Sequence, residues 1–197
     1  MKDKILRVLV ILIIVGSFIY IGYRSSSVSI EWMDSFLGSL ILFFSVIIIY
    51  TIQLFLHEVG HLIGGLITGY KFVSFRIGSF ILIKNKTGKL EIKRMNVLGT
   101  GGQCLMCPPD VPIEECPYKL YHLMGGIMNL VVGMICLILS ILLPKGMLNF
   151  YLFEISAILN FMFGITSLIP ARINGIQNDG YNFIDLEKIN LPRKHQI

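Results

Sequence analysis

Four long runs of apolar residues are separated by short polar links and by one longer polar region in this 197-residue chain. Each run is long enough to cross a hydrocarbon layer about 30 Å thick, which predicts membrane-spanning helices. The expected spans are residues 5–23, 35–69, 119–143 and 147–169. The second run would form a helix about 52 Å long at about 1.5 Å per residue, so it must tilt, bend or extend past the membrane face. We therefore expect a mostly helical integral membrane protein with one membrane-embedded domain, 1–197.

The polar region, residues 70–118, has the pattern of β-structure. Residues between Phe72 and Ile83 are rich in strand formers, the turn sequence Asn85–Gly88 follows, and residues 90–95 alternate in polarity. This pattern predicts a β-hairpin between the second and third spans. The glycine-rich segment 98–106 fits either a re-entrant loop or an edge strand that holds an extended substrate, so Gly101 and Gly102 are candidate substrate-binding residues.

The distribution of lysine and arginine predicts the orientation of the chain in the membrane. Only 15% of the residues are charged, while 54% are hydrophobic, and the net charge is +5. With four spans and a cytoplasmic N-terminus, every lysine and arginine except Arg24 and Lys145 falls on the cytoplasmic side. Both termini, the hairpin region and the tail 170–197 are therefore expected in the cytoplasm. This bias accounts for the basic composition, so we expect the lipid bilayer and no nucleic acid as a partner.

A candidate metal site lies inside the second apolar run. His57, Glu58 and His61 form the pattern H-E-x-x-H, which places both histidines on one face of a helix. Two imidazoles in this arrangement can bind zinc, and the neighbouring carboxylate can take a proton from water. Ionisable groups are costly in a membrane span, which favours a functional interpretation over two histidines and a glutamate that satisfy one another in the core.

A tetrahedral hydrolytic zinc site needs a third protein ligand besides water. Asp179 lies just past the fourth span on the same expected side as the histidines, although an Asp-Gly turn or a helix N-cap would equally explain it. The other residues that could supply the ligand are His122, His195, Asp110, Glu114, Glu115 and Glu154.

Three motifs together resemble the site-2 protease family of intramembrane zinc metalloproteases. They are H-E-V-G-H in a span, Gly125-Gly126-x-x-Asn129 in the third span, and Asn178-Asp179-Gly180 after the fourth, so the resemblance covers roughly residues 54–180. It implies that His57, His61 and Asp179 bind one zinc ion and that Glu58 is the catalytic general base. It also implies that Asn129 binds the substrate backbone. The implied substrate is a transmembrane segment or hydrophobic peptide, cleaved near the cytoplasmic face of a bacterial cell membrane.

The chain departs from that family in two places. Gly126 stands where proline is usual, and residues 171–178 separate Ser167-Leu-Ile-Pro170 from the Asp-Gly pair by more than is common. Such departures leave two further hypotheses open. The protein could be a metal transporter or another non-catalytic metal-binding membrane protein, or it could be an inactive family member that acts as a binding partner.

Three cysteines, Cys104, Cys107 and Cys116, fall within the loop that precedes the third span. They could belong to a second metal site or a redox pair. A structural zinc needs four ligands, however, and the sequence nearby offers only His122 as the fourth, which favours free thiols.

Overall fold

The structure is a computed structural model, and it describes residues 35–85, 87–95, 101–112, 115–144, 148–173 and 176–189. The predicted first span, residues 5–23, lies outside the described residues. His195 and Glu114, two of the candidate ligands, also lie outside them.

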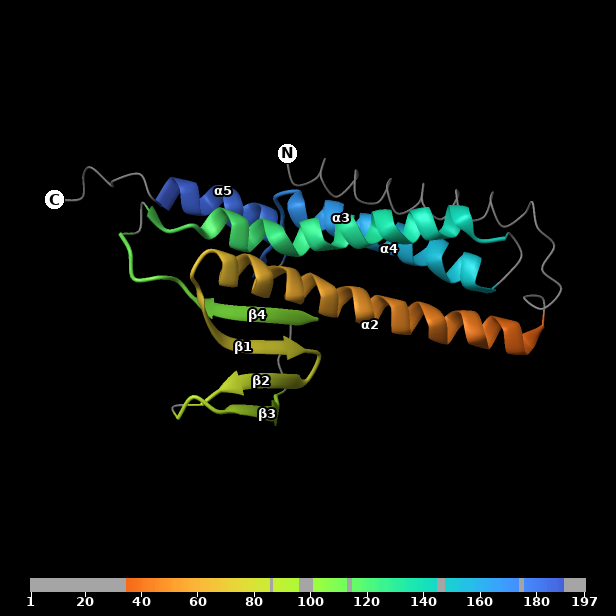
Figure 1. Cartoon of the computed structure of the whole chain (residues 1–197), viewed down its shortest axis with the longest axis horizontal. Helices are drawn as coiled ribbons and strands as arrows, with labels where there is room; N and C mark the ends of the chain where they lie inside the picture. The colour runs from red at the N-terminus through yellow and green to blue at the C-terminus, as the bar shows by residue number, and fades with distance from the viewer. Residues whose placement is uncertain are drawn as a thin grey trace. The chain divides into compact units, whose positions relative to one another are not determined.

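Three long apolar helices follow the predicted second, third and fourth spans (Figure 1). They are α2 (Phe36–Ile67), α3 (Tyr118–Leu142) and α4 (Leu148–Leu168), and each is long and apolar enough to cross a membrane. Their bounds agree with the sequence prediction to within two residues. Helix α2 is a single helix of 32 residues. At about 1.5 Å per residue it exceeds a bilayer core of about 30 Å, as its composition predicted.

The polar region forms more than the single hairpin that the sequence predicted. Its strands, β1 (Lys71–Ile77), β2 (Phe80–Lys84), β3 (Leu90–Arg94) and β4 (Gly102–Cys107), make one antiparallel sheet in the order β3-β2-β1-β4. The predicted turn at Asn85–Gly88 joins β2 to β3, where the Asn85 side chain accepts hydrogen bonds from the backbone N–H groups of Thr87 and Lys89. The glycine-rich segment supplies β4, so of its two expected forms the edge strand is correct.

The chain divides into two compact units, and helices α2, α3 and α4 each contribute to both. Unit 1 consists of Met1–Gln53 with Asn129–Thr166, and unit 2 consists of Leu54–Met128 with Ser167–Ile197. In unit 1, buried polar side chains connect the helices. Asn129 is completely buried, and its amide donates hydrogen bonds to the Gln53 carbonyl and to Oδ1 of Asn160.

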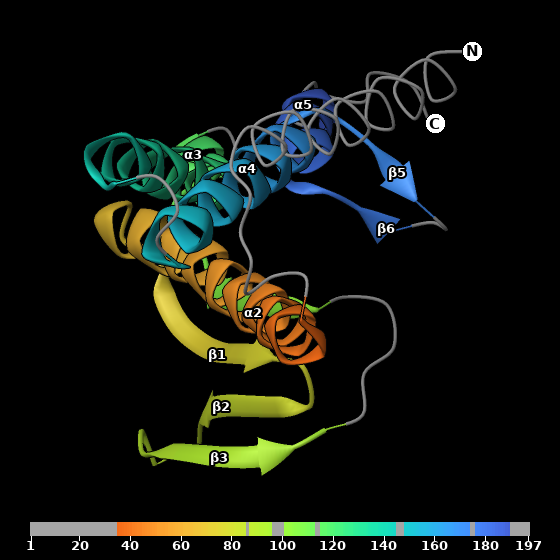
Figure 2. The same cartoon turned by 90° about the vertical axis from the view of Figure 1, so that its right-hand side faces the viewer.

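In unit 2, strand β4 runs beside the C-terminal part of α2, and the other strands extend away from it (Figures 1 and 2). The contact is close because glycines lie on both sides of it. A Cβ on Gly101 would lie 3.0 Å from Leu54, and one on Gly65 would overlap the sulfur of Met106. Tyr70, Cys104 and Met106 form the buried core of this unit.

The end of unit 2 contains a second, short hairpin and a helix. Strands β5 (Arg172–Ile173) and β6 (Ile176–Gln177) pair with each other, and helix α5 (Asp179–Ile189) follows directly (Figure 2). These elements occupy part of the tail that the sequence placed after the fourth span.

Candidate metal centre

Helix α2 presents two histidines on one face, one turn apart. The side chains of His57 and His61 are buried, and their Nε2 atoms lie 3.2 Å from each other. The short separation follows from the four-residue spacing, because residues i and i+4 of a helix lie one above the other. The Nε2 atoms of both imidazoles are therefore directed toward the same position.

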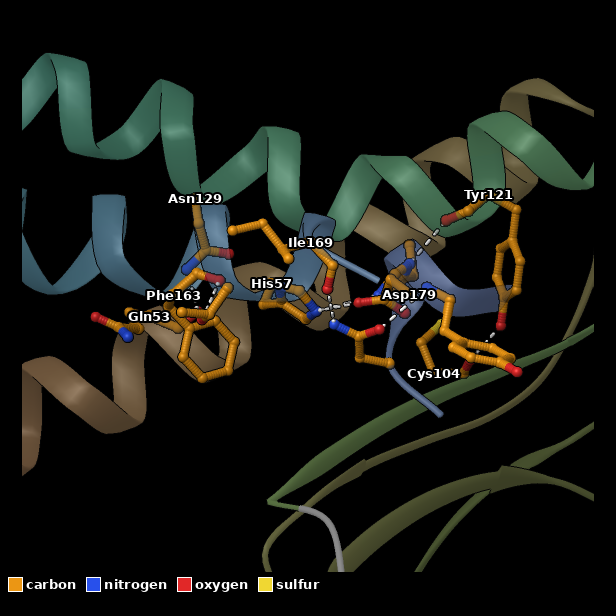
Figure 3. Close-up of polar contacts among 12 residues, drawn as sticks. Gln53, His57, Cys104, Tyr121, Asn129, Phe163, Ile169 and Asp179 are labelled. Atoms are coloured by element: carbon orange, nitrogen blue, oxygen red, sulfur yellow. Dashed lines mark hydrogen bonds and ion pairs between the residues drawn. The ribbon is translucent and has the colours of Figure 1, made fainter. Parts of the chain in front are cut away.

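Asp179 supplies a carboxylate at that point (Figure 3). Its Oδ2 lies 3.1 Å from Nε2 of His57, and its Oδ1 lies 3.3 Å from Nε2 of His61. Among the described residues, His57, His61 and Asp179 form the group of potential ligands whose donor atoms converge. The structure thus brings together all three residues that the sequence proposed as metal ligands.

The β5–β6 hairpin explains how Asp179 reaches the histidines despite the long segment after Pro170. The Asn178 N–H donates to the Ala171 carbonyl, and the Ala171 N–H donates to Oδ1 of Asn178. These two hydrogen bonds place Asn178 directly beside Ala171, shortly after the end of α4. The same Asn178 Oδ1 accepts the N–H of Tyr181, so Asn178 and not Asp179 caps helix α5.

The spacing of the three donor atoms fits a zinc ion. Ligand atoms about 2.0–2.1 Å from a tetrahedral zinc are about 3.3–3.4 Å apart. The two Nε2 atoms are 3.2 Å apart, and each lies at a similar distance, 3.1 or 3.3 Å, from a different oxygen of the Asp179 carboxylate. One ligand atom from each residue lies within 4.8 Å of the others. Two imidazole nitrogens and one carboxylate oxygen are also a donor set that zinc accepts in hydrolytic sites. These residues can therefore hold the metal with little rearrangement.

Tyr121 orients one of the two imidazoles. Nδ1 of His61 lies 2.7 Å from the Tyr121 carbonyl. A carbonyl oxygen can only accept a hydrogen bond, so Nδ1 of His61 must carry the proton. In the neutral ring, Nε2 then keeps a lone pair directed at the donor triangle, which is the group formed by His57, His61 and Asp179. Such a hydrogen bond to the far nitrogen is the usual support of a metal-binding histidine.

The carboxylate of Asp179 is held in its charged form. Burial opposes ionisation, but when His57 and His61 also carry a proton on Nε2, their hydrogen bonds and charges outweigh it and hold the pKa of Asp179 below its usual range. An ionised carboxylate at neutral pH is the form that binds a cation.

Helix α3 packs directly on the histidines through Gly125. A Cβ at Gly125 would lie 2.4 Å from Nε2 of His61 and 2.8 Å from Cε1 of His57. The glycine is therefore needed for close approach, because any larger side chain would occupy the space of the imidazoles.

Replacing Gly125 with alanine is expected to reduce metal binding. The added methyl must displace the rings or the helix, at a stability cost of about 1–3 kcal/mol, which is usual for overpacking. Gly133→Ala on the same helix is the control, since its Cβ would meet neighbours at 3.3 Å, none of them a histidine. Metal content and thermal unfolding of both variants would test this. Equal metal content in the two variants would contradict it.

Glu58 lies between the histidines in sequence and faces β4. Its side chain is buried, and a Cβ on Gly102 would lie 2.6 Å from its Oε1. The backbone N–H of Cys104 is also hydrogen-bonded to the Glu58 carboxylate. Strand β4 and Glu58 are therefore in direct contact, and Glu58 lies on the same helix as His57 and His61.

The backbone of Cys104 points away from β1. The Gly78 N–H donates to the Gly101 carbonyl, which makes Ile77–Gly102 a pair without mutual hydrogen bonds, and the alternation continues to Phe75–Cys104. The Cys104 carbonyl instead accepts the hydroxyl of Tyr121 (Figure 3). One residue, Tyr121, thus contacts a histidine of the donor triangle through its backbone and the edge strand through its side chain.

The three predicted substrate-binding residues have different positions. Gly101 and Gly102 pack against Leu54 and Glu58 of α2 in unit 2. Asn129 belongs to unit 1, where its amide is used in packing between helices. A substrate-binding role for all three stays a prediction.

The cysteines are free thiols in the structure. Cys104 is buried, which raises the pKa of its thiol to about 12, while Cys107 is exposed and Cys116 is half-buried. Since the thiolate is the metal-binding form, a buried Cys104 is poorly suited to a second metal site. Its sulfur instead packs with Tyr70 and Met106 in the core.

The sequence did not predict the site contacts of three residues, Tyr121, Gly125 and Asn178. Asn178 carried a local signal, because asparagine directly before an acidic first turn is a common N-cap. Tyr121 carried none, and Gly125 was named only as part of the Gly125-Gly126-x-x-Asn129 motif, because their contacts with His61 join segments about 60 residues apart. Comparison of the chain with protein-family models, curated proteins and solved structures gave no match.

Proposed function

We propose that this protein is a zinc-dependent endopeptidase of the membrane, of the type found in the site-2 protease family. The observation that carries the proposal is the convergence of His57, His61 and Asp179, with Glu58 one residue away from the first ligand. Apolar helices that can cross a membrane and the sequence motifs support the same proposal.

Each residue has a distinct task in the proposed hydrolysis. His57, His61 and Asp179 would hold zinc, which when bound acts as a Lewis acid on water and on the scissile carbonyl. Glu58 would remove the proton from the attacking water and then deliver it to the leaving amine. The Tyr121 carbonyl would keep His61 in the tautomer that binds metal.

The proposed substrate is a hydrophobic peptide or a transmembrane segment that is locally unwound. A peptide bond in a helix is shielded by its own turn, so hydrolysis requires an extended backbone. Strand β4 could hold such a backbone by strand addition, because the N–H and C=O of Cys104 point away from β1. The incoming peptide would replace their present contacts with Glu58 and Tyr121, next to the donor triangle.

Metal removal tests the proposal. Purified protein in detergent or vesicles is expected to contain about one zinc per chain and to cleave a hydrophobic peptide, since the donor set matches a three-ligand catalytic site. A chelator should abolish cleavage, and added zinc should restore it. Cleavage that survives complete removal of the metal would contradict the proposal.

Metal transport is a second candidate, because unit 1 contains further buried polar residues in apolar helices. Glu154 and Asn160 of α4 are both buried there, together with Asn129 and Ser140 of α3. Polar groups along a membrane span often mark a path for ions. Zinc flux into vesicles that is retained when Glu58 is replaced by glutamine would favour transport over hydrolysis.

A further inference from the structure

The outer part of the sheet in unit 2 exposes large apolar side chains on one face. Phe80, Leu90 and Ile92 are 65%, 59% and 75% exposed. The β2–β3 register pairs Phe80 with Arg94, Leu82 with Ile92 and Lys84 with Leu90, so all six side chains belong to the same face. The face is therefore apolar in its middle, with a basic residue at each end.

This face is continuous with the part of the sheet that packs against α2. Phe75 of β1 pairs with Leu82 of β2, and its ring lies 5.5 Å from that of Phe55 on α2. The exposed apolar surface and the contact with α2 therefore lie on one side of the sheet. That side extends outward from a helix long and apolar enough to span a bilayer.

The direction of the strands shows which end of the face is nearer to the apolar part of α2. Gly101, directly before β4, packs against Leu54, whereas Met106 of β4 packs against Gly65. The successive cross-strand partners in one row of the sheet are Gly102, Ile77, Phe80 and Arg94. Gly102 packs against Glu58, so Phe80 belongs to the row nearest the end of the uncharged stretch 35–56, and Lys84 lies at the opposite end.

We propose that this face of β2 and β3 lies in the headgroup region of the bilayer that α2 enters, with Phe80 and Ile92 at the boundary of the acyl chains. An exposed apolar surface of this kind in a protein usually marks a contact. Lipid is the occupant because basic side chains flank the apolar centre, as on surfaces that bind anionic membranes. Arg94 and Lys84 can extend their charged ends to acidic headgroups while their stems cover apolar surface.

Neighbouring positions of β3 offer a matched test. Ile92 belongs to the proposed lipid face, and Lys93 points to the opposite face of the same strand. Trp32 is the single tryptophan, so Trp32→Phe gives a background without tryptophan fluorescence, into which Ile92→Trp or Lys93→Trp is introduced. The full chain is then placed in vesicles of phosphatidylcholine and phosphatidylglycerol, with brominated lipid or aqueous iodide as the quencher.

We expect brominated lipid to remove most of the emission of the Ile92→Trp variant and little of that of Lys93→Trp. Iodide should show the opposite order. Equal quenching of the two variants by lipid would overturn the proposal, and so would protection of position 92 from both quenchers, since a protein partner or second copy would then cover the face. The measurement needs no catalysis, so its outcome is independent of the proposed hydrolysis.

Discussion

Changing Glu58 to glutamine is expected to abolish peptide hydrolysis and to leave zinc bound. Glutamine has nearly the same size and keeps the contacts with Gly102 and Cys104, but it cannot accept a proton. General-base catalysis usually contributes about 10²–10⁴ in rate, so the rate of cleavage should fall by at least this range. Metal content should not change, because Glu58 is not one of the three convergent ligands.

The control for this variant is Glu91→Gln on the sheet. Glu91 is bonded to Asn85 and Lys93 and has no contact with the donor triangle, so the variant should retain cleavage. Initial rates with a fluorogenic hydrophobic peptide, together with metal analysis, would measure both. Full activity in Glu58→Gln would exclude Glu58 as the base. Loss of zinc in that variant would mean that the glutamate is itself a ligand.

The local elements of this fold could be predicted because each depends on neighbouring residues. Three spans followed from runs of apolar residues, and the β2–β3 turn followed from Asn85–Gly88. The complete sheet could not be predicted. Strand β4 joins β1 across more than 20 residues of sequence, and its glycines gave equal support to a loop.

In the candidate site, too, only the residues that are neighbours in sequence could be predicted from local patterns. His57, Glu58 and His61 are local, since helical spacing alone brings the histidines together. Asp179 needed the family resemblance, because its approach depends on the hydrogen bonds between Ala171 and Asn178, which no sequence pattern indicated. Gly125 and Tyr121 could be recognised only from the structure, since glycine and tyrosine in an apolar helix have many other uses.

Replacing Asp179 with alanine is expected to remove most of the bound zinc and to abolish cleavage. The change deletes the only acidic ligand of the convergent group and leaves the two imidazoles. Loss of an outer-shell partner already lowers metal affinity by about 10- to 100-fold, so loss of a direct ligand should lower it by more than about 100-fold. Competition with a fluorescent zinc chelator would measure the affinity.

Asp110→Ala provides the matched control for Asp179→Ala. Asp110 is another carboxylate of unit 2, it was a candidate ligand on sequence grounds, and it is exposed outside the donor triangle. Its removal changes the net charge by the same amount, so any effect of charge alone would appear in both variants. If both bind zinc as tightly as the unmodified protein, the carboxylate of Asp179 is not a ligand. The two histidines would then need a different third partner, such as His122 of α3 or one of the residues at 114 and 195.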